Sequence, residues 1–398
     1  MTKCLYVVYW GATEPLGLAL VLPVVEALAE RGEEIYLITF DKPADRTDAL
    51  VTSIASRLHA RGVRWIDLTY HKRPRNWSTG LDIARGLAVG GYLVLRHRIP
   101  LVHGRTYVGG IIAWLLGAML PVRVIFHNDG FWPEEQVDAG VWTDRSRAFR
   151  LARFLARAMY RRADGLVVLS ERALDLVRQD PDVAATPVTI APSGVDVARF
   201  ARPRVPRPDG VPLRLIYVGG LGGRYPIGPL VDLFALAMSR YRGTHCRIAS
   251  RHPAEEVAPH LARWGLGPGD VPCAPVPAAA VPALLAEQDA GVHLLSPGKS
   301  SAGGSPTKVG EYLAAGLPVV TTADAGDLDA ILRKTRTGVV LRSTERIDLE
   351  RGLDELTALL ADEDLDRRCR EAARFYYALE RSVEAHAEIH ARVLAGAA

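Results

Sequence analysis

The sequence predicts an α/β protein made of two Rossmann-like domains whose parallel sheets face a central cleft. Two β-α-β openings support this prediction. Each has an apolar strand, a glycine-containing loop and a helix, and they begin near residues 3 and 213. The third observation is a strand, loop, helix and strand unit over residues 291–321. With 398 residues, the chain is long enough for two domains of ordinary size.

Composition indicates a well-packed protein. Hydrophobic residues make up 48% and charged residues 24% of the chain, which excludes a disordered protein, and a net charge of +4 cannot by itself argue for nucleic acid. The four cysteines are scattered, so we expect a reduced, cytoplasmic setting with neither a disulfide framework nor a zinc site. The apolar stretch at 5–10 suits a first strand better than a signal peptide. The stretch at 108–122 is too short to span a membrane and suits a buried helix.

The first β-α-β opening predicts a strand at residues 3–10 and a helix at 18–31. Apolar side chains recur at helical spacing in that helix, Gly32 closes it, and the next strand follows at 35–40. The loop between strand and helix reads G-A-T-E-P-L-G. It lacks the G-x-G-x-x-G fingerprint, so a nicotinamide cofactor has little support.

Polar residues follow the ends of two later strands. In L-V-H-G-R-T-Y, His103 stands at a strand end, where a lone histidine is more often structural than catalytic, and Arg105 could bind a phosphate or an acceptor carboxylate. In H-N-D-G-F-W-P-E-E, Asp129 and Glu134 flank Trp132. This combination suits sugar binding, because an aromatic face stacks on a sugar and carboxylates bind its hydroxyl groups. A turn with buried rings and solvated acids fits these residues equally well.

Residues 145–162 predict a helix with seven arginines and no acidic residue. Apolar side chains at helical spacing predict its packing stripe: Leu151, Phe154, Leu155, Ala158 and Met159. The helix could lie on an anionic membrane surface. Alternatively, it packs on the core with a solvated basic face. We favour this second interpretation because the strand predicted at 165–169 requires the helix anyway.

A loop rich in glycine and serine, followed by a helix, carries the strongest functional signal. Ser305 suits the N-cap of that helix, Pro306 its first position and Gly316 its C′ position. A helix start at the carboxyl end of a parallel sheet forms an anion site, to which Lys299 and Lys308 add positive charge. These residues predict a phosphate site.

Glu311 lies about two turns into the same helix, too far for a cap but placed to accept a hydrogen bond from a sugar hydroxyl. Loops of this kind also occur in proteins that bind no phosphate, and Lys308 could simply pair with Glu311 at i,i+3. Residue chemistry alone leaves phosphate binding and a purely structural role equally open.

The string P-T-K-V-G-E-Y-L-A-A-G-L-P-V-V, at residues 306–320, resembles the donor-site segment of glycosyltransferase family 4, the retaining enzymes with the GT-B fold. Segments at 163–171 and 190–196 resemble other parts of the family, and the resemblance covers nearly the whole chain. It implies transfer of a sugar from a nucleotide-diphosphate sugar to an acceptor hydroxyl, with retention and with no metal or other cofactor. Loop amides would hold the diphosphate and Glu311 the ribose.

The resemblance also implies a domain plan and a set of site residues. The plan is an N-terminal acceptor domain over 1–200, a proline-rich linker over 201–212, a donor domain over 213–375 and a final helix at 376–398 that crosses back onto the first domain. The expected donor-binding residues are Gly17, Gly219, Gly220, Arg251, Ser305, Pro306 and Thr307. Acceptor binding falls to Asp129, Trp132 and Glu134, and the reaction to Arg224, Lys308, Glu311, His103 and Arg105.

Three positions depart from the family pattern. Gly303 stands where the first glutamate of an E-x7-E pair is usual, and Arg105 replaces the second histidine of an H-x-H pair. In the loop G-G-L-G-G-R-Y, Gly220 replaces the usual arginine, which leaves Arg224 for the role of the usual lysine. A fixed guanidinium there would stabilise the charge of a departing nucleoside diphosphate. A solvated loop arginine is the alternative.

Two acceptors fit the sequence. A lipid-linked or surface polysaccharide intermediate suits the 129–142 segment and the basic helix, which would place the protein at the inner face of the membrane. A small natural product, such as an aminocyclitol or a nucleoside, suits the alanine- and arginine-rich composition of a GC-rich bacterium. A nucleotide-sugar epimerase of the same fold, and a sugar-nucleotide-binding partner without activity, are the alternatives from other classes.

Overall fold

The computed structural model describes residues 2–71, 75–183, 185–206 and 211–396. The chain forms two units, each with its own parallel sheet and hydrophobic core. One unit comprises Met1–Pro133, Trp142–Gly194 and Leu379–Ala398, and the other Glu134–Val141 and Val195–Ala378. The predicted α/β class with two parallel sheets is confirmed. In the linker predicted at 201–212, residues 207–210 lie outside the described residues.

The first sheet has the strand order β3-β2-β1-β4-β5-β6-β7, and all its strand pairs are parallel. The chain moves outward from β1 and then returns to the other side of β1, so the topological switch point lies between β1 and β4. The strands are β1 (Lys3–Val8), β2 (Glu34–Asp41), β3 (Arg64–Thr69), β4 (Leu101–Arg105), β5 (Arg123–His127), β6 (Gly165–Val168) and β7 (Val188–Ile190).

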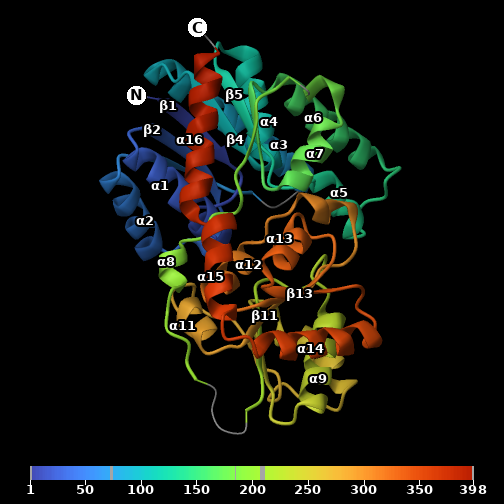
Figure 1. The fold of residues 1–398 in the computed structure, drawn as a ribbon. Coiled ribbons are helices and arrows are strands. Elements are labelled where there is room, and N and C mark those ends of the chain that lie inside the picture. The colour runs from blue at the N-terminus through green and yellow to red at the C-terminus, as the bar shows by residue number, and fades with distance from the viewer. Residues whose placement is uncertain (1, 72–74, 184, 207–210, 397–398) are drawn as a thin grey trace. The chain divides into compact units, whose positions relative to one another are not determined.

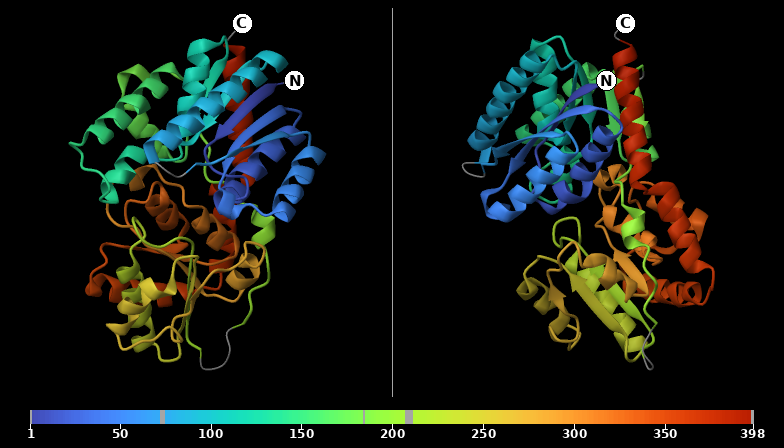
Figure 2. Two further views of the ribbon diagram at one scale, coloured as in Figure 1. Left: turned by 180° about the vertical axis from the view of Figure 1, so that it is seen from behind. Right: turned by 90° about the vertical axis from the view of Figure 1, so that its left-hand side faces the viewer.

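Helices cover both faces of this sheet, and Figure 1 shows α16 running along it. Helix α16, red in the right-hand view of Figure 2, packs on one face together with α1 and α2, and α3 and α4 pack on the other face. The helices of the unit are α1 (Leu22–Glu30), α2 (Asp48–Ala60), α3 (Arg75–His97), α4 (Thr106–Met119), α6 (Arg147–Arg162), α7 (Glu171–Arg178) and α16 (Leu379–Ala395), with short turns at Pro43–Asp45 and Pro181–Val183. Helix α5 (Trp132–Asp138) spans the boundary between the two units.

Local sequence explains several of these helix starts. Thr47, Ser146 and Ser170 each accept a hydrogen bond from the backbone N–H three residues ahead, which satisfies a donor that the helix leaves unpaired. The predicted helix after β1 begins instead with a π-helical turn, η1 (Gly17–Val21). A Cβ at Gly17 would lie 1.9 Å from the carbonyl oxygen of Gly11, so only glycine fits this close approach.

The second sheet has the order β10-β9-β8-β11-β12-β13, again parallel throughout. Its strands are β8 (Arg214–Val218), β9 (His245–Ala249), β10 (Cys273–Ala274), β11 (Ala290–His293), β12 (Val319–Thr322) and β13 (Gly338–Leu341). Its helices are α8 (Val197–Phe200), α9 (Ile227–Arg240), α10 (Ala254–Ala262), α11 (Val281–Ala286), η4 (Lys299–Gly303), α12 (Thr307–Ala314), α13 (Leu328–Thr335), α14 (Arg346–Leu360) and α15 (Leu365–Tyr376).

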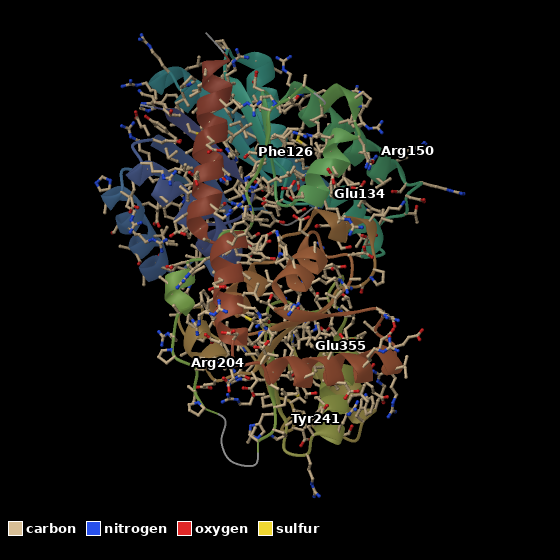
Figure 3. All side chains as sticks on the ribbon, viewed as in Figure 1. Phe126, Glu134, Arg150, Arg204, Tyr241 and Glu355 are labelled. Carbon is tan, nitrogen blue, oxygen red and sulfur yellow. The ribbon has the colours of Figure 1, made fainter. Side chains whose placement is uncertain are left out.

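The beginning of the predicted linker is held to the second unit. The guanidinium of Arg204, labelled in Figure 3, donates hydrogen bonds to the backbone carbonyls of Gly316 and Gln288 and to the carboxylate of Asp289. Asp289 also pairs with Arg214 at the start of β8. The segment that enters the second sheet is therefore fixed by a buried carboxylate with two arginine partners.

The packing stripe predicted for the basic helix α6 is only partly buried: Met159 is buried, and Leu155 and Ala158 are half-buried. Ala152 is also buried, whereas Leu151 is 59% and Phe154 66% exposed. These two apolar side chains therefore share the solvated surface with arginines such as Arg150, which Figure 3 labels.

Candidate active site

The candidate site lies in the second unit, at the carboxyl ends of its central strands. The chain leaves β8 for β9 on one side and returns to β11 on the other, so β8 and β11 flank the topological switch point. In open parallel sheets, ligands bind in the crevice at this position. Three segments of the unit begin there: the glycine loop after β8, the loop after β11 and the start of α12.

Helix α12 begins one residue later than predicted. Pro306 is its N-cap rather than its first residue, with an extended backbone (φ −73°, ψ 115°), so the prediction of Ser305 as N-cap was wrong. Proline has no side-chain acceptor, so the first N–H groups of the helix, from Thr307 onward, receive no side-chain cap. Gly316 stands at C′ with φ +81°, as predicted. The uncapped start is a suitable anion site.

Lys308, in the first turn of α12, lies among aromatic rings. Its Nζ donates a 2.9 Å hydrogen bond to the hydroxyl of Tyr217 and lies 4.1 Å and 4.4 Å from the ring centroids of Tyr217 and Tyr225. The Tyr217 hydroxyl in turn donates to the carbonyl of Gly220. Gly219 has φ +128°, and a Cβ there would lie 2.8 Å from the Lys308 amine. The glycine loop therefore leaves room for the lysine.

Burial changes the charge of this lysine. Removal from water lowers the pKa of Lys308 to about 7; Glu311 opposes the change and Arg224 adds to it. Burial likewise raises the pKa of Glu311 to about 7, although Arg199 and Lys308 attract its charged form. Each group loses more by desolvation than it gains from its neighbours, so both titrate near neutral pH, where each is about half ionised. An anionic ligand would favour the charged lysine.

Arg224 supplies the second cation of the site. Its Nη1 donates a 2.8 Å hydrogen bond to Glu135, and its Nε is buried without a partner among the described residues. Its Nη2 would lie 3.9 Å from a Cβ at Gly304, two residues before the N-cap of α12. The guanidinium thus lies beside the start of the same helix that carries Lys308.

The remaining predicted donor-side residues are peripheral or structural. Lys299 and Arg251 are exposed at the loops that follow β11 and β9. Gly303, at the position of the missing glutamate, is buried in η4, where the backbone N–H of the neighbouring Ser300 donates a 2.8 Å bond to Asp138. No carboxylate therefore projects from position 303.

Sequence reasoning missed three residues of this site. Tyr217 and Tyr225 enclose the Lys308 amine, and the tyrosines that flank the glycine loop in the sequence were the available signal. His293, at the end of β11, is fully buried, and neither of its ring nitrogens has a hydrogen-bond partner among the described residues. Burial, with Lys308 and Arg224, holds the pKa of His293 well below its usual value. A buried unpaired imidazole beside two cations can accept a hydrogen bond from a ligand.

In the first unit, Arg105 and Asp129 form an internal ion pair. Arg105 is 2% exposed, its Nε and Nη2 donate to the Asp129 carboxylate, and its Nη1 donates to the carbonyl of Leu20. Gly17 allows the backbone to pass close to the carbonyl oxygen of Gly11. The structure thus gives these residues roles within the fold, and their roles toward a ligand stay predictions.

The other first-half residues lie in different surroundings. Trp132 is half-buried, with ring contacts to Tyr107 and Trp142 at centroid distances of 4.9 and 5.0 Å. Glu134 is buried rather than solvated. His103 is buried on β4 with three further histidines around it, so it is not a lone histidine. None of these contacts tests acceptor binding.

Comparisons with known proteins bear on the family and the fold. Residues 19–194 match the glycosyl transferase 4-like domain family. Sucrose-phosphate synthase from Thermosynechococcus elongatus has a similar structure, with a TM-score of 0.75 at 15% identity over 100% of both chains. Because that alignment spans the whole of both chains, the fold of the second unit is included. Residues 19–194 thus resemble a glycosyl transferase 4-like domain, and the whole chain has the GT-B fold.

Two further structures resemble this chain along nearly all of its length. Anabaena HepE in complex with UDP has a TM-score of 0.68 at 14% identity, over 97% of this chain and 99% of that one. WaaG, a glycosyltransferase involved in lipopolysaccharide biosynthesis, has a TM-score of 0.68 at 16% identity, over 98% and 99%. At these identities the likeness establishes the GT-B fold. No curated protein sequence matches the chain.

Proposed function

We propose that the protein is a glycosyltransferase that moves a sugar from a nucleotide-diphosphate sugar to an acceptor hydroxyl, with retention of configuration and without a metal ion at the reacting centre. The observation that carries the proposal is the pairing of Lys308 and Arg224 beside the uncapped start of α12. Two cations and free backbone N–H groups suit a diphosphate. The UDP bound to the similar HepE structure supports the same ligand class.

The residues have distinct roles in this proposal. Lys308 and the N–H groups of α12 bind the diphosphate, Glu311 accepts a hydrogen bond from the ribose, and Arg224 stabilises the negative charge that develops as the sugar departs. The leaving phosphate itself assists the incoming hydroxyl, and this requires no protein nucleophile. The cation pair and helix start fulfil the electrostatic role that a metal would otherwise have.

A thermal-shift panel tests the donor site directly. UDP, GDP, ADP, TDP and CMP are added without metal to the wild type and to Lys308→Ala. A ligand at about 100 times its Kd should stabilise the fold by roughly 2.7 kcal/mol, enough to raise Tm measurably. We expect one nucleoside diphosphate to raise the Tm of the wild type alone. No shift with any nucleotide would contradict the proposal, and binding without sugar transfer to any acceptor would indicate a binding protein instead.

Binding of that nucleoside diphosphate should weaken as the pH rises above neutrality. Because the pKa of free Lys308 is about 7 and a neighbouring phosphate favours the charged amine, binding takes up a proton wherever the free lysine is neutral. Between about pH 7.5 and 9, affinity should fall by up to roughly tenfold per pH unit. Glu311, whose pKa is also about 7, is already mostly ionised over this range and contributes little.

The control for this pH dependence is Lys308→Arg. Arginine stays charged throughout the range, so titration calorimetry on the variant should give an affinity that changes little with pH. Equal slopes for wild type and variant would show that another group takes up the proton.

On the acceptor side, we propose contact of α6 with an anionic membrane surface, in line with a lipid-linked acceptor. The supporting observation is the exposure of Leu151 and Phe154 among arginines, because apolar and basic side chains together bind anionic lipid interfaces. None of the described helices combines the length and apolar character that crossing a membrane requires.

Sedimentation with phosphatidylglycerol vesicles should show binding that Leu151→Ser/Phe154→Ser reduces about 30-fold, because two apolar side chains that insert into the lipid each contribute about 1 kcal/mol or more. Phosphatidylcholine vesicles should bind weakly in both cases. The matched control is Ile347→Ser, which removes a similarly exposed apolar side chain from α14. Undiminished vesicle binding by the double variant would contradict the membrane contact.

A further inference from the structure

Four histidines from three distant parts of the chain meet inside the first unit. His103 comes from β4, His127 ends β5, and His386 and His390 lie on α16, which packs on β5, β6 and β7. All four are at most 1% exposed. The ring of His103 is stacked on Tyr6, with centroids 4.4 Å apart, and lies against the other three imidazoles. Such a concentration of polar rings in a core needs a chemical explanation.

Three of these imidazoles direct one nitrogen each toward a common point. The Nδ1 of His127 lies 3.3 Å from the Nε2 of His103 and 3.3 Å from the Nε2 of His386. One nitrogen of each ring lies within 4.8 Å of those of the other two. Two nitrogens bound at about 2.0–2.1 Å to one tetrahedral zinc ion are separated by about 3.3–3.4 Å. Two of the three spacings therefore match those of a zinc ligand set, and the third lies within 4.8 Å.

The outer nitrogens show which tautomers these rings adopt. The Nδ1 of His386 lies 2.6 Å from the carbonyl of Ser382, so it carries the proton and leaves Nε2 as a lone pair. The Nδ1 of His390 lies 2.8 Å from a carboxylate oxygen of Glu33, so in a neutral His390 the proton is on Nδ1 and Nε2 is also a lone pair. That lone pair accepts from the Nδ1 of His103, 2.9 Å away. The Nε2 of His103 is consequently a second lone pair at the common point.

His127 decides between hydrogen bonding and metal binding. If its proton is on Nδ1, it can reach only one of the two lone pairs well, and its own Nε2 lone pair faces the Asp129 carboxylate 3.4 Å away. If its proton is on Nε2, it points toward that carboxylate, and three lone pairs converge.

We propose that His103, His127 and His386 bind a divalent transition metal ion, most suitably Zn²⁺, in the core of the first unit. A set of three neutral imidazoles suits Zn²⁺ and similar ions rather than Mg²⁺ or Ca²⁺. The outer nitrogen of His386 donates to the Ser382 carbonyl and that of His103 to His390, with Glu33 behind it. The Nε2 of His127 lies 3.4 Å from the Asp129 carboxylate but makes no hydrogen bond among the described residues. The prediction that the sequence suggests no zinc site considered cysteine spacing only.

The proposed ion is a structural element, separate from the sugar-transfer residues of the second unit. Two of its ligands lie on the central strands and the third on α16, more than 250 residues later, so the ion ties the last helix to the sheet. A Cβ at Gly165 of β6 would lie only 2.6 Å from a methyl group of Val393, which shows how closely this helix packs. Metal loss should therefore loosen α16 first.

The test begins with the full chain produced without a histidine tag in zinc-supplemented medium. Inductively coupled plasma mass spectrometry should find about one zinc ion per chain. After unfolding with a chelator and refolding without metal, Tm should fall, and added Zn²⁺ should restore it. Refolding with Co²⁺ should give the intense visible absorption of a tetrahedral nitrogen site. Wild type with less than a tenth of an ion per chain, and no cobalt absorption, would overturn the proposal.

Two variants locate the ion. His386→Gln should lose the metal, whereas His245→Gln, an exposed histidine at the start of β9, should keep it. Metal retained by both would overturn the assignment. If His386→Gln fails to fold, the wild-type cobalt spectrum and metal-dependent Tm decide the question alone. The Tm shift induced by UDP is also measured in the metal-free protein, so that the metal site and the donor site are tested separately.

Discussion

Lys308→Met should abolish most donor binding without weakening the fold. The lysine amine lies on the rings of Tyr217 and Tyr225, where burial already lowers its pKa to about 7. A methionine of similar length can occupy this aromatic environment without the desolvation cost, so Tm should stay the same or rise. A charge-assisted hydrogen bond to phosphate is worth about 1.5–3 kcal/mol, so calorimetry should show affinity for the nucleoside diphosphate reduced roughly 10- to 150-fold.

The control for Lys308→Met is Lys334→Met, which removes an exposed lysine from α13 in the same unit. This control changes the net charge by the same amount as Lys308→Met and leaves the fold intact. It should bind the diphosphate like the wild type. A loss of affinity equal in both variants would mean that long-range charge rather than contact with Lys308 attracts the ligand. Lost affinity together with a lowered Tm would mean that the lysine supports the fold.

The sequence was sufficient to predict the helix that carries the candidate site, because proline and glycine mark its two ends. The N-cap was wrong by one residue because Ser305 and Pro306 are both compatible with the extended N-cap conformation, and the structure places it at Pro306. The glycine loop was also predictable. That this loop leaves room for the Lys308 amine was not predictable. Only the fold brings Lys308, 89 positions later, to within 2.8 Å of where a Cβ at Gly219 would lie.

Periodicity located only part of the buried face of α6. Met159 of the predicted stripe is buried, whereas Leu151 and Phe154 are exposed and the neighbouring Ala152 is buried instead. Ala152 gives little hydrophobic signal, so the pattern favoured the larger Leu151. The histidine cluster was beyond any local pattern, since 287 positions separate His103 from His390. Local chemistry is therefore readable from the chain, whereas convergence of distant residues requires the sheet topology.

Arg224→Met should lower kcat by about 10²–10³-fold, with a smaller change in KM. The guanidinium lies beside the start of α12, and its value is largest when negative charge develops on the leaving diphosphate, so its loss resembles the removal of one oxyanion-stabilising donor. Steady-state kinetics with the donor identified by thermal shift would measure the effect. Arg224→Lys should recover part of the rate, because it keeps the charge but loses the planar guanidinium.

The matched control is Arg263→Met, which removes another ion-paired arginine of the second unit, the partner of Asp232. Its kcat should equal that of the wild type. Glu135→Gln gives an independent check, since the Glu135 carboxylate forms an ion pair with the Arg224 guanidinium. Without that carboxylate, a diphosphate no longer competes for the arginine and should bind several-fold more tightly. An Arg224→Met variant with unchanged kcat would place the stabilisation of the leaving group elsewhere, and Lys308 would then be the residue that provides it.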